Sequence, residues 1–195
     1  MKSIIKSIFL FCVFAVSFMS CETYSDPKAE YSPIYPLSGE WTVRITNLNT
    51  GSLVSTSMYT LGTYNTSDNV ANQMWLRFTS NIPTFSPDAS IPKTVMSKIS
   101  CDVAGLSFST TAGTQNLNVA ADKTNWPAYP VNAVIDTITI TEAKVTLNSV
   151  VMPSKVTADR ISFKLSKTKA PGVVFLVEGY RSTRWAEDEN VIDFK

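Results

Sequence analysis

The sequence predicts an all-β fold, an antiparallel up-and-down β-barrel of about eight strands. Apolar and polar residues alternate with a period of two along most of the chain after Gly39, which is typical of strands with one buried face. Gly, Pro and Asn residues separate these runs, and no amphipathic helix of more than two turns stands out. Many short strands with regular turns indicate a sandwich or a barrel.

The expected strands follow one another from the first alternating run to the last. They lie near residues 40–47, 53–62, 72–80, 95–103, 105–110, 115–119, 135–150, 159–166 and 172–184. Residues 173–177 are apolar on both faces of their strand. This fits a barrel strand that is covered from outside, and a central sandwich strand would fit nearly as well.

Residues 1–20 have the three parts of a secretory signal peptide. Lys2 and Lys6 give a positive start, residues 8–18 are mostly apolar, and small Ser20 comes directly before Cys21. The apolar run is shorter than the roughly 20 residues that a membrane span needs. An uncleaved anchor helix is the alternative, but no stop-transfer pattern follows the run.

Cleavage before Cys21 is expected from the residues around it. Phe18-Met19-Ser20-Cys21 resembles a lipobox, although the usual pattern has Leu in place of Phe18. We expect Cys21 to be lipidated and to hold the protein at the membrane, as an outer-membrane lipoprotein of the cell envelope. Proline-containing residues 21–36 would form a flexible tether, and residues 37–195 would form the barrel domain.

Composition excludes several classes of function. Removal of Lys2 and Lys6 with the signal leaves 15 basic against 16 acidic residues, and no basic run indicates nucleic acid as a partner. Loss of Cys12 and acylation of Cys21 would leave Cys101 without a disulfide partner. We expect Cys101 to be a small buried hydrophobe.

The chain contains no histidine, which removes His-dependent catalysis and ordinary zinc sites. No Gly-x-Ser-x-Gly motif is present, and Ser166-Lys167-Thr168-Lys169 matches Ser-x-x-Lys only in a polar loop. The acidic residues at 187–193 lack the spacing of a calcium loop, and we expect a solvated tail there. We therefore predict no catalytic residue, no metal site and no cofactor.

A hydrophobic ligand is the best-supported partner, because an eight-stranded barrel can hold one small molecule. Two proline-stiffened loops, residues 81–92 and 124–130, could form a lid with aromatic side chains. The alternative, which the residues favour slightly, is that these loops cap the core. The ligand-binding candidates from strands and loops are Tyr59, Trp75, Phe85, Phe108, Trp126 and Tyr129.

Two resemblances add to this interpretation. Gly39-Glu40-Trp41 at the first strand, with Arg181 and Arg184 at the last, resembles the calycin superfamily, which includes the lipocalins. This resemblance implies that a tryptophan stacks beneath an arginine and closes one end of the barrel, a contact of about 0.5–2 kcal/mol.

The mature chain also resembles the Bacteroidota lipoproteins called lipid-binding putative hydrolases. The similarity rests on the lipobox, the tether, residues 37–43 and residues 178–183, followed by Glu187-Asp188. The family usually has Gly after its final Arg-x-Thr, whereas Arg184-Trp185 follows here.

Three hypotheses follow for the function. The first is a non-enzymatic, membrane-anchored protein that binds a small lipid-like molecule in its barrel. The second is a structural or accessory subunit of an envelope or nutrient-uptake complex, with a filled barrel and a protein partner. The third is a lipid or ester hydrolase.

Overall fold

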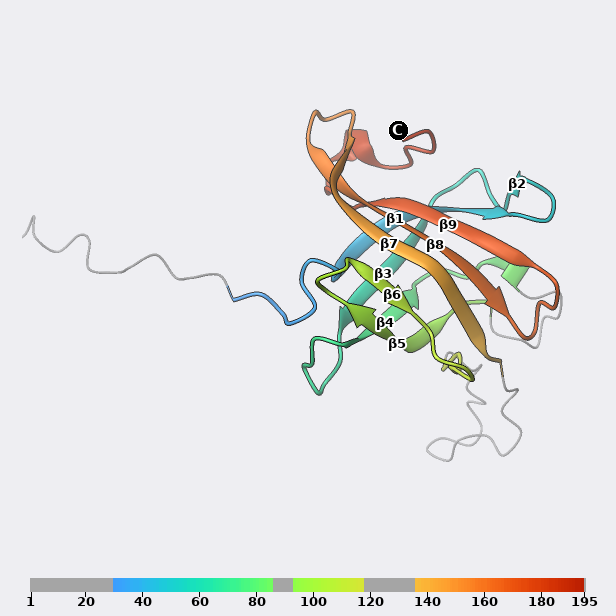
Figure 1. Ribbon diagram of the computed structural model, residues 1–195. Coiled ribbons are helices and arrows are strands. Elements are labelled where there is room, and N and C mark those ends of the chain that lie inside the picture. The colour runs from blue at the N-terminus through green and yellow to red at the C-terminus, as the bar shows by residue number, and fades with distance from the viewer. Residues whose placement is uncertain (1–29, 86–92, 118–135, 195) are drawn as a thin grey trace, which may run out of the picture. The chain divides into compact units, whose positions relative to one another are not determined.

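One antiparallel sheet forms the folded part of the chain. The computed structural model describes residues 30–85, 93–117 and 136–194, and the chain divides into two units, Met1–Tyr31 and Ser32–Lys195. The strand order in the second unit is β2-β1-β3-β4-β5-β6-β7-β8-β9, and β1 also pairs with β9. This last pairing closes eight strands into a barrel, with β2 attached to β1 as an extra short strand (Figure 1).

The strands are β1 (Gly39–Asn47), β2 (Ser52–Leu53), β3 (Tyr59–Asn65), β4 (Gln73–Phe78), β5 (Met96–Asp102), β6 (Ser107–Ser109), β7 (Ile138–Val151), β8 (Thr157–Lys167) and β9 (Val174–Arg181). Two short 3-10 turns, η1 (Pro83–Phe85) and η3 (Ala186–Asp188), accompany them. None of the helical segments in the described part of the chain could span a bilayer.

The predicted fold class is confirmed: the chain is all-β and the barrel is closed and antiparallel. The expected strand at 53–62 is in fact two, β2 and β3, with turns and bends between them. The expected strand at 115–119 is reduced to one bridge between Gln115 and Thr137, and its last residues lie outside the described chain.

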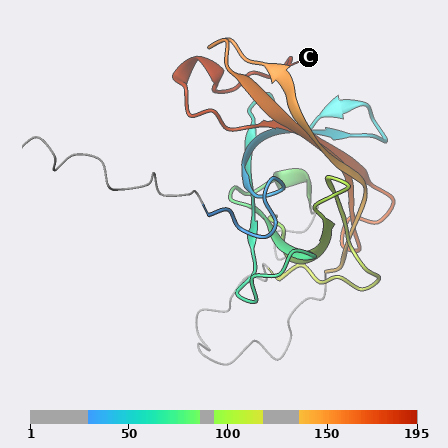
Figure 2. The same ribbon diagram turned by 60° about the vertical axis from the view of Figure 1, so that its left-hand side comes forward.

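Alternate residues of each strand fill the barrel interior, which the strands enclose in Figure 2. On β1 the buried positions are Trp41, Val43 and Ile45. The other strands contribute Leu61, Met74, Leu76, Phe78, Ile99, Phe108, Ile138, Ile140, Val145, Ile161, Phe163, Leu165, Phe175 and Val177, all at most 4% exposed. Burial of this apolar surface is the main source of stability.

The two ends of the barrel are closed by different residues. We call the end at which β1 begins and β9 stops the Arg181 end, and the opposite end, at which β8 stops, the Lys167 end. The two long connections, residues 79–95 and 110–137, both leave and rejoin the barrel at the Lys167 end. The turns at the Arg181 end are short.

The folded part begins earlier than the sequence suggested. Ile34 and Leu37 have no exposed surface and belong to the barrel core. The tether was expected to extend to residue 36, but Ile34 lies inside that range. A single isoleucine among prolines gives no periodic signal, so its burial could not be inferred from the pattern.

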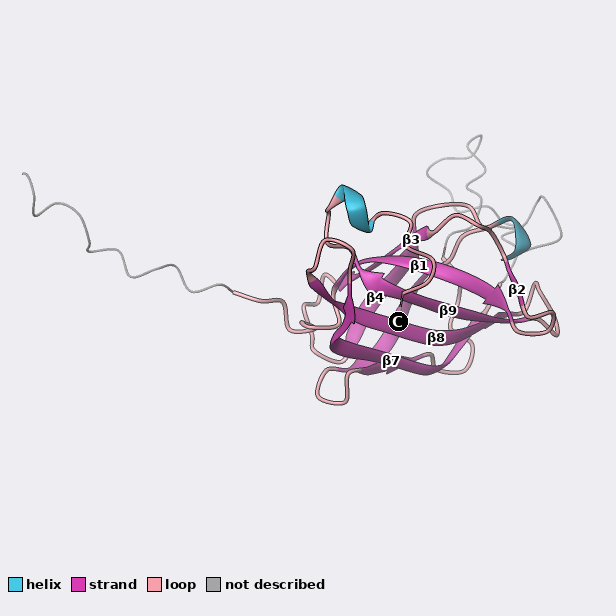
Figure 3. Ribbon diagram, turned by 90° about the horizontal axis from the view of Figure 1, so that it is seen from above, coloured by secondary structure: helices cyan, strands magenta, loops and turns pink. Residues whose placement is uncertain are grey.

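The C-terminal segment packs on the outer face of the barrel through Asp188 and Phe194, whereas the other acidic residues, Glu187, Glu189 and Asp193, are exposed as expected. Phe194 is 6% exposed and lies between the guanidinium groups of Arg44 and Arg160, 4.9 and 5.7 Å from its ring centroid. Tyr180 donates a hydrogen bond to the carbonyl of Asp188 at 2.6 Å, and burial raises the pKa of its phenol. Figure 3 shows the C-terminus above β8 and β9.

Asp188 holds the start of this segment and should make its docking sensitive to acid. Burial alone would raise the pKa of its carboxyl, but hydrogen bonds from Ser154 and Thr183 outweigh burial and lower the pKa below the ordinary 3.8. The contribution of Asp188 to stability is therefore complete above pH 3.8 and is lost as the pH falls through the lowered value.

We expect Asp188→Asn to lower the urea midpoint at pH 7, and the difference from the wild type to shrink below pH 3.8. Glu187→Gln is the matched control, because Glu187 is the exposed neighbour and should give a small difference at every pH. An Asp188→Asn difference that stays constant down to the acid range would contradict this account.

Candidate functional site

Arg181 lies across the indole ring of Trp41 at the Arg181 end. Its guanidinium carbon is 4.3 Å from the ring centroid, and the two residues are partners in the β1–β9 pairing. Arg181 Nε donates to Oδ2 of Asp159 at 2.8 Å, and the two terminal nitrogens donate to the carbonyls of Pro36 and Ser38. Arg181, on β9, therefore links β8 and the segment before β1 through hydrogen bonds across this end.

Gly39 leaves room for the guanidinium, since a Cβ at this position would collide with Nη1 of Arg181. The indole N–H of Trp41 donates to Oγ1 of Thr63 at 2.8 Å, and the Thr63 hydroxyl donates to the carbonyl of Leu37 at 2.6 Å. These two hydrogen bonds satisfy the indole N–H, the Thr63 hydroxyl and the Leu37 carbonyl within the protein. The stacked side chains of Trp41 and Arg181 therefore cover this end of the barrel.

Arg184 takes no part in the closure, which corrects its assignment as a barrel-closing residue. Its side chain is 73% exposed and its Nη2 lies 3.1 Å from Oε1 of Glu40. The physical reason is local: β9 has ended at Arg181, and Arg184 has a positive φ of 65° that turns the chain away.

The middle of the barrel is packed with side chains. Phe108, a predicted ligand-binding residue, is 4% exposed and meets Phe163 edge to face, with 5.4 Å between ring centroids. Ala143 is its partner on β7. Phe108 is therefore an interior residue, and in this structure it contacts other core side chains.

A buried ion pair occupies the Lys167 end. Lys167 Nζ lies 3.0 Å from Oδ2 of Asp136, and the two side chains are 0% and 2% exposed. Asn116 donates to the same carboxylate at 3.0 Å and to the carbonyl of Thr94 at 2.9 Å. These polar groups lie at the end of an interior that is otherwise mainly apolar.

Phe85 covers this ion pair. Its ring is 5.5 Å from Lys167 Nζ, packs edge to face on Phe78 at 5.5 Å and lies 5.0 Å from Phe175. Phe85 was a ligand-binding candidate in a loop expected either to form a lid or to cap the core, and it is fully buried, as is Ile82. The three-residue turn η1 places it there, so at these two residues the connection caps the core.

The other ligand-binding candidates lie in different places. Tyr59 is half-buried on β3 and packs against the core. Trp75 is on the outer face of β4, where its ring lies 5.6 Å from Lys98 Nζ. It alternates with buried Met74 and Leu76, so it cannot reach the interior. Trp126 and Tyr129 lie outside the described residues.

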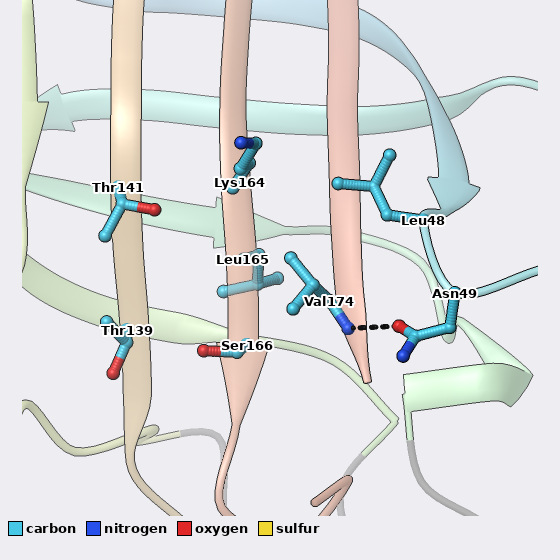
Figure 4. A pocket seen from close by; sticks show the side chains of 8 residues that line it. All are labelled: Leu48, Asn49, Thr139, Thr141, Lys164, Leu165, Ser166 and Val174. Atoms are coloured by element: carbon cyan, nitrogen blue, oxygen red, sulfur yellow. Dashed lines mark hydrogen bonds between the residues drawn. The ribbon is translucent and has the colours of Figure 1, made fainter. Parts of the chain in front are cut away.

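Among the pockets that the described residues line, three lie on the outer surface. The first, of about 430 Å³, is formed by the outer faces of β7, β8 and the start of β9 (Figure 4). Its lining is Leu48, Asn49, Thr139, Thr141, Lys164, Leu165, Ser166 and Val174. Lys164 pairs with Glu142 at 2.6 Å, and Asn49 accepts a hydrogen bond from the N–H of Val174 at 3.0 Å. Five of the eight lining residues carry polar side chains, and Leu48, Leu165 and Val174 are apolar.

The second and third pockets have volumes of about 240 and 420 Å³ and adjoin the Arg181 end, where Ser182 and Thr183 line both. The described residues hold no group of three or more His, Cys, Asp or Glu side chains placed to bind a metal.

Ser166 and Cys101 are the two nucleophile candidates that the sequence analysis considered. Ser166 is on the outer face of strand β8, so no helical turn brings it to Lys169, whose N–H is instead 3.3 Å from Oδ1 of Asp136. Cys101 is buried, and burial raises the pKa of its thiol, which disfavours the reactive thiolate.

Sequence reasoning missed Lys167, Asp136 and Asn116. The signal for the first two was present in the alternation. Lys167 continues the inward series of Ile161, Phe163 and Leu165, and Asp136 precedes inward Ile138 by two residues. A charged residue at an inward position of a strand needs a partner of opposite charge, and Lys167 and Asp136 are partners of each other.

Comparison with known proteins identifies a family for the chain. No curated protein matches the chain. A family model described as lipid-binding putative hydrolase matches residues 26–186, which covers most of the chain and all eight strands of the barrel. The chain therefore belongs to the family of lipid-binding putative hydrolases.

Proposed function

We propose that this protein is an envelope lipoprotein, anchored through Cys21, that binds one single-chain lipid in its barrel without chemical turnover. The observation that carries the proposal is the buried Lys167–Asp136 pair at one end of an apolar interior. The family and the barrel fold support a lipid-binding role. The anchor and the location in the outer membrane rest on the residues before the barrel.

Stability alone is a weak reason for this ion pair. Two charges taken out of water lose hydration that their attraction only partly restores, and apolar replacements are often equally stable. The pair has a clearer use in a binding site. A lipid carboxylate that reached Lys167 would take over the role of Asp136 as counter-charge, with its chain along the apolar interior.

Entry at the Lys167 end needs the smallest rearrangement. The cover is a short turn rather than a strand, held by the hydrogen bonds from Ile82 N–H to the Lys93 carbonyl at 2.7 Å and from Phe85 N–H to the Ile82 carbonyl at 2.9 Å. Outward movement of Ile82 and Phe85 would uncover Lys167 and the rings of Phe78 and Phe175. The opposite end is held by the many bonds of Arg181.

Phe85→Ala should increase the affinity for a long-chain fluorescent fatty acid about tenfold, because less apolar contact has to be broken before the ligand enters. The measurement is a fluorescence titration of the delipidated protein. Phe194→Ala is the matched control, since it removes a buried ring that packs on the outer face of the barrel, away from both the cover and the interior.

Equal effects of the two substitutions would contradict entry beneath Phe85. No saturable uptake by any variant would contradict lipid binding in the barrel. That result would favour the second function, an accessory subunit of an envelope complex. The tight packing of Phe108 against Phe163 is the observation that favours this alternative.

A further inference from the structure

Exposed apolar side chains gather at the Arg181 end. Tyr35, Leu147 and Val156 are 48%, 41% and 38% exposed and line the same pocket of about 420 Å³. Val151, 70% exposed, is close in the chain and lies on the same hairpin. Large exposed apolar groups that cluster at one place mark a contact surface more often than chance.

The β7–β8 hairpin carries most of this surface past the end of the barrel. The pairing of β8 with β9 stops at Arg160 and Tyr180, whereas β7 and β8 stay paired to Val151 and Thr157. Leu147 continues the inward alternation of Ala143 and Val145, but it lies beyond the core and so remains exposed. Figure 1 shows this hairpin projecting past the other strands.

The chain enters the barrel at this same end. Tyr35 and Pro36 line the pocket, and Arg181 binds the carbonyl of Pro36. Ten residues lie between Cys21 and Ser32, and the eleven Cα–Cα steps that join the two span at most about 40 Å when fully extended. With Cys21 in a bilayer, as proposed above, the Arg181 end is the part of the barrel held near the lipid.

We propose that the Arg181 end docks on the bilayer that holds the anchor, through the apolar surface of Tyr35, Leu147, Val151 and Val156. A tyrosine suits the interface, because its ring is apolar and its hydroxyl reaches water. Lys155 is exposed at the tip of the hairpin, where its ammonium can meet lipid phosphates. Docking by this end directs the Lys167 end, with its proposed entry, away from that bilayer.

The test uses the full lipidated chain in vesicles of phosphatidylethanolamine with a minority of phosphatidylglycerol. A polarity-sensitive nitrobenzoxadiazole dye is attached at Val151→Cys or, as the control, at Leu53→Cys. Leu53 is 43% exposed on β2, and its partner Thr46 lies near the Lys167 end of β1. The native Cys101 is buried, so it competes little for the dye.

We expect the dye at position 151 to shift its emission to the blue and to be quenched by spin-labelled lipid chains, and the dye at 53 to do neither. Val151→Cys combined with Val156→Asp should lose most of the shift, because the charge resists entry into lipid. Equal emission from the two positions, or a shift at position 53 alone, would overturn the docking proposal.

Failure of the anchor gives a different result from failure of docking. Without a lipid at Cys21, the chain would behave like Cys21→Ser and leave the vesicle fraction, which overturns docking together with the proposed anchor. If docking alone is wrong, the chain stays with the vesicles while the dye at 151 remains in water. Fatty-acid uptake by the same sample reports separately on the proposed binding.

Discussion

Replacement of Arg181 by alanine should lower the free energy of unfolding by about 3 kcal/mol, while Arg184→Ala should change it by less than about 0.5 kcal/mol. The substitution at 181 removes the stacking on Trp41 and the hydrogen bonds that Arg181 donates to the carbonyls of Pro36 and Ser38 and to Oδ2 of Asp159. Loss of the hydrogen-bond partner of a partly buried polar group lowers the free energy of unfolding by about 1–3 kcal/mol. Loss of the contact with the Trp41 ring lowers it further.

The two arginines make a matched pair, because both were predicted to close the barrel and only one does. Arg184 is largely exposed and has a single ion pair with Glu40. Urea denaturation of the two variants measures the difference. Arg181→Lys should fall between them, since one ammonium cannot donate in the planar fork that reaches several acceptors. Similar midpoints for Arg181→Ala and Arg184→Ala would show that this closure contributes little.

Gly179→Ala should destabilise the protein by about 2–3 kcal/mol through the pairing of β1 with β9. Gly179 is the partner of Val43, and a Cβ at this position would collide with the carbonyl oxygen of Thr42 and lie 2.7 Å from Cα of Val43. These are backbone atoms, so relief requires the two strands to move apart. A glycine within a strand often marks such a close approach.

Gly62→Ala is the control for Gly179→Ala. Gly62 is also within a strand, but the nearest atoms to an added Cβ lie at 3.9 Å, which is ordinary contact. We expect the Gly62 variant to match or slightly exceed the wild type, because alanine restricts the unfolded chain. Thermal unfolding of the two variants tests this, and equal loss at both positions would contradict the role given to Gly179.

The barrel could be predicted because its core follows a local rule. Trp41, Val43 and Ile45 alternate with exposed or half-buried residues, and the same rule holds on β4 and β8. That rule also placed Trp75 outward, in phase opposite to Met74 and Leu76. Trp75 was nevertheless predicted to bind the ligand, although its position in the alternation directs the ring out of the barrel.

The packing of the C-terminal segment could not be predicted from its composition. Its contacts join residues that are far apart in the chain, such as Arg44 with the carbonyl of Ile192 at 2.8 Å. Arg44 and Arg160 also flank Glu178 at 3.2 and 2.7 Å, which leaves both guanidinium groups placed against Phe194. Such an arrangement depends on which strands pair. It cannot be inferred from the acidic composition of the C-terminal segment.

The buried pair at the Lys167 end shows a different limit. Inward phase identifies Lys167 and Asp136 as unusual, but their 3.0 Å contact depends on the register of β7 with β8, which pairs Ile138 with Lys167. Phe85 completes the site from a connection with no periodic pattern. The sequence therefore reveals the charged residues, and only the fold shows that they meet beneath one ring.

The position of a bound lipid carboxylate tests the central claim most directly. A fatty acid labelled with ¹³C at and next to its carboxyl group is added to saturation, and nuclear Overhauser contacts to protein side chains are measured. We expect contacts from the carboxyl end to Lys167 and from the chain to Phe175 and Ile138. Contacts confined to the outer pocket, at Lys164, Thr141 and Val174, would contradict binding inside the barrel.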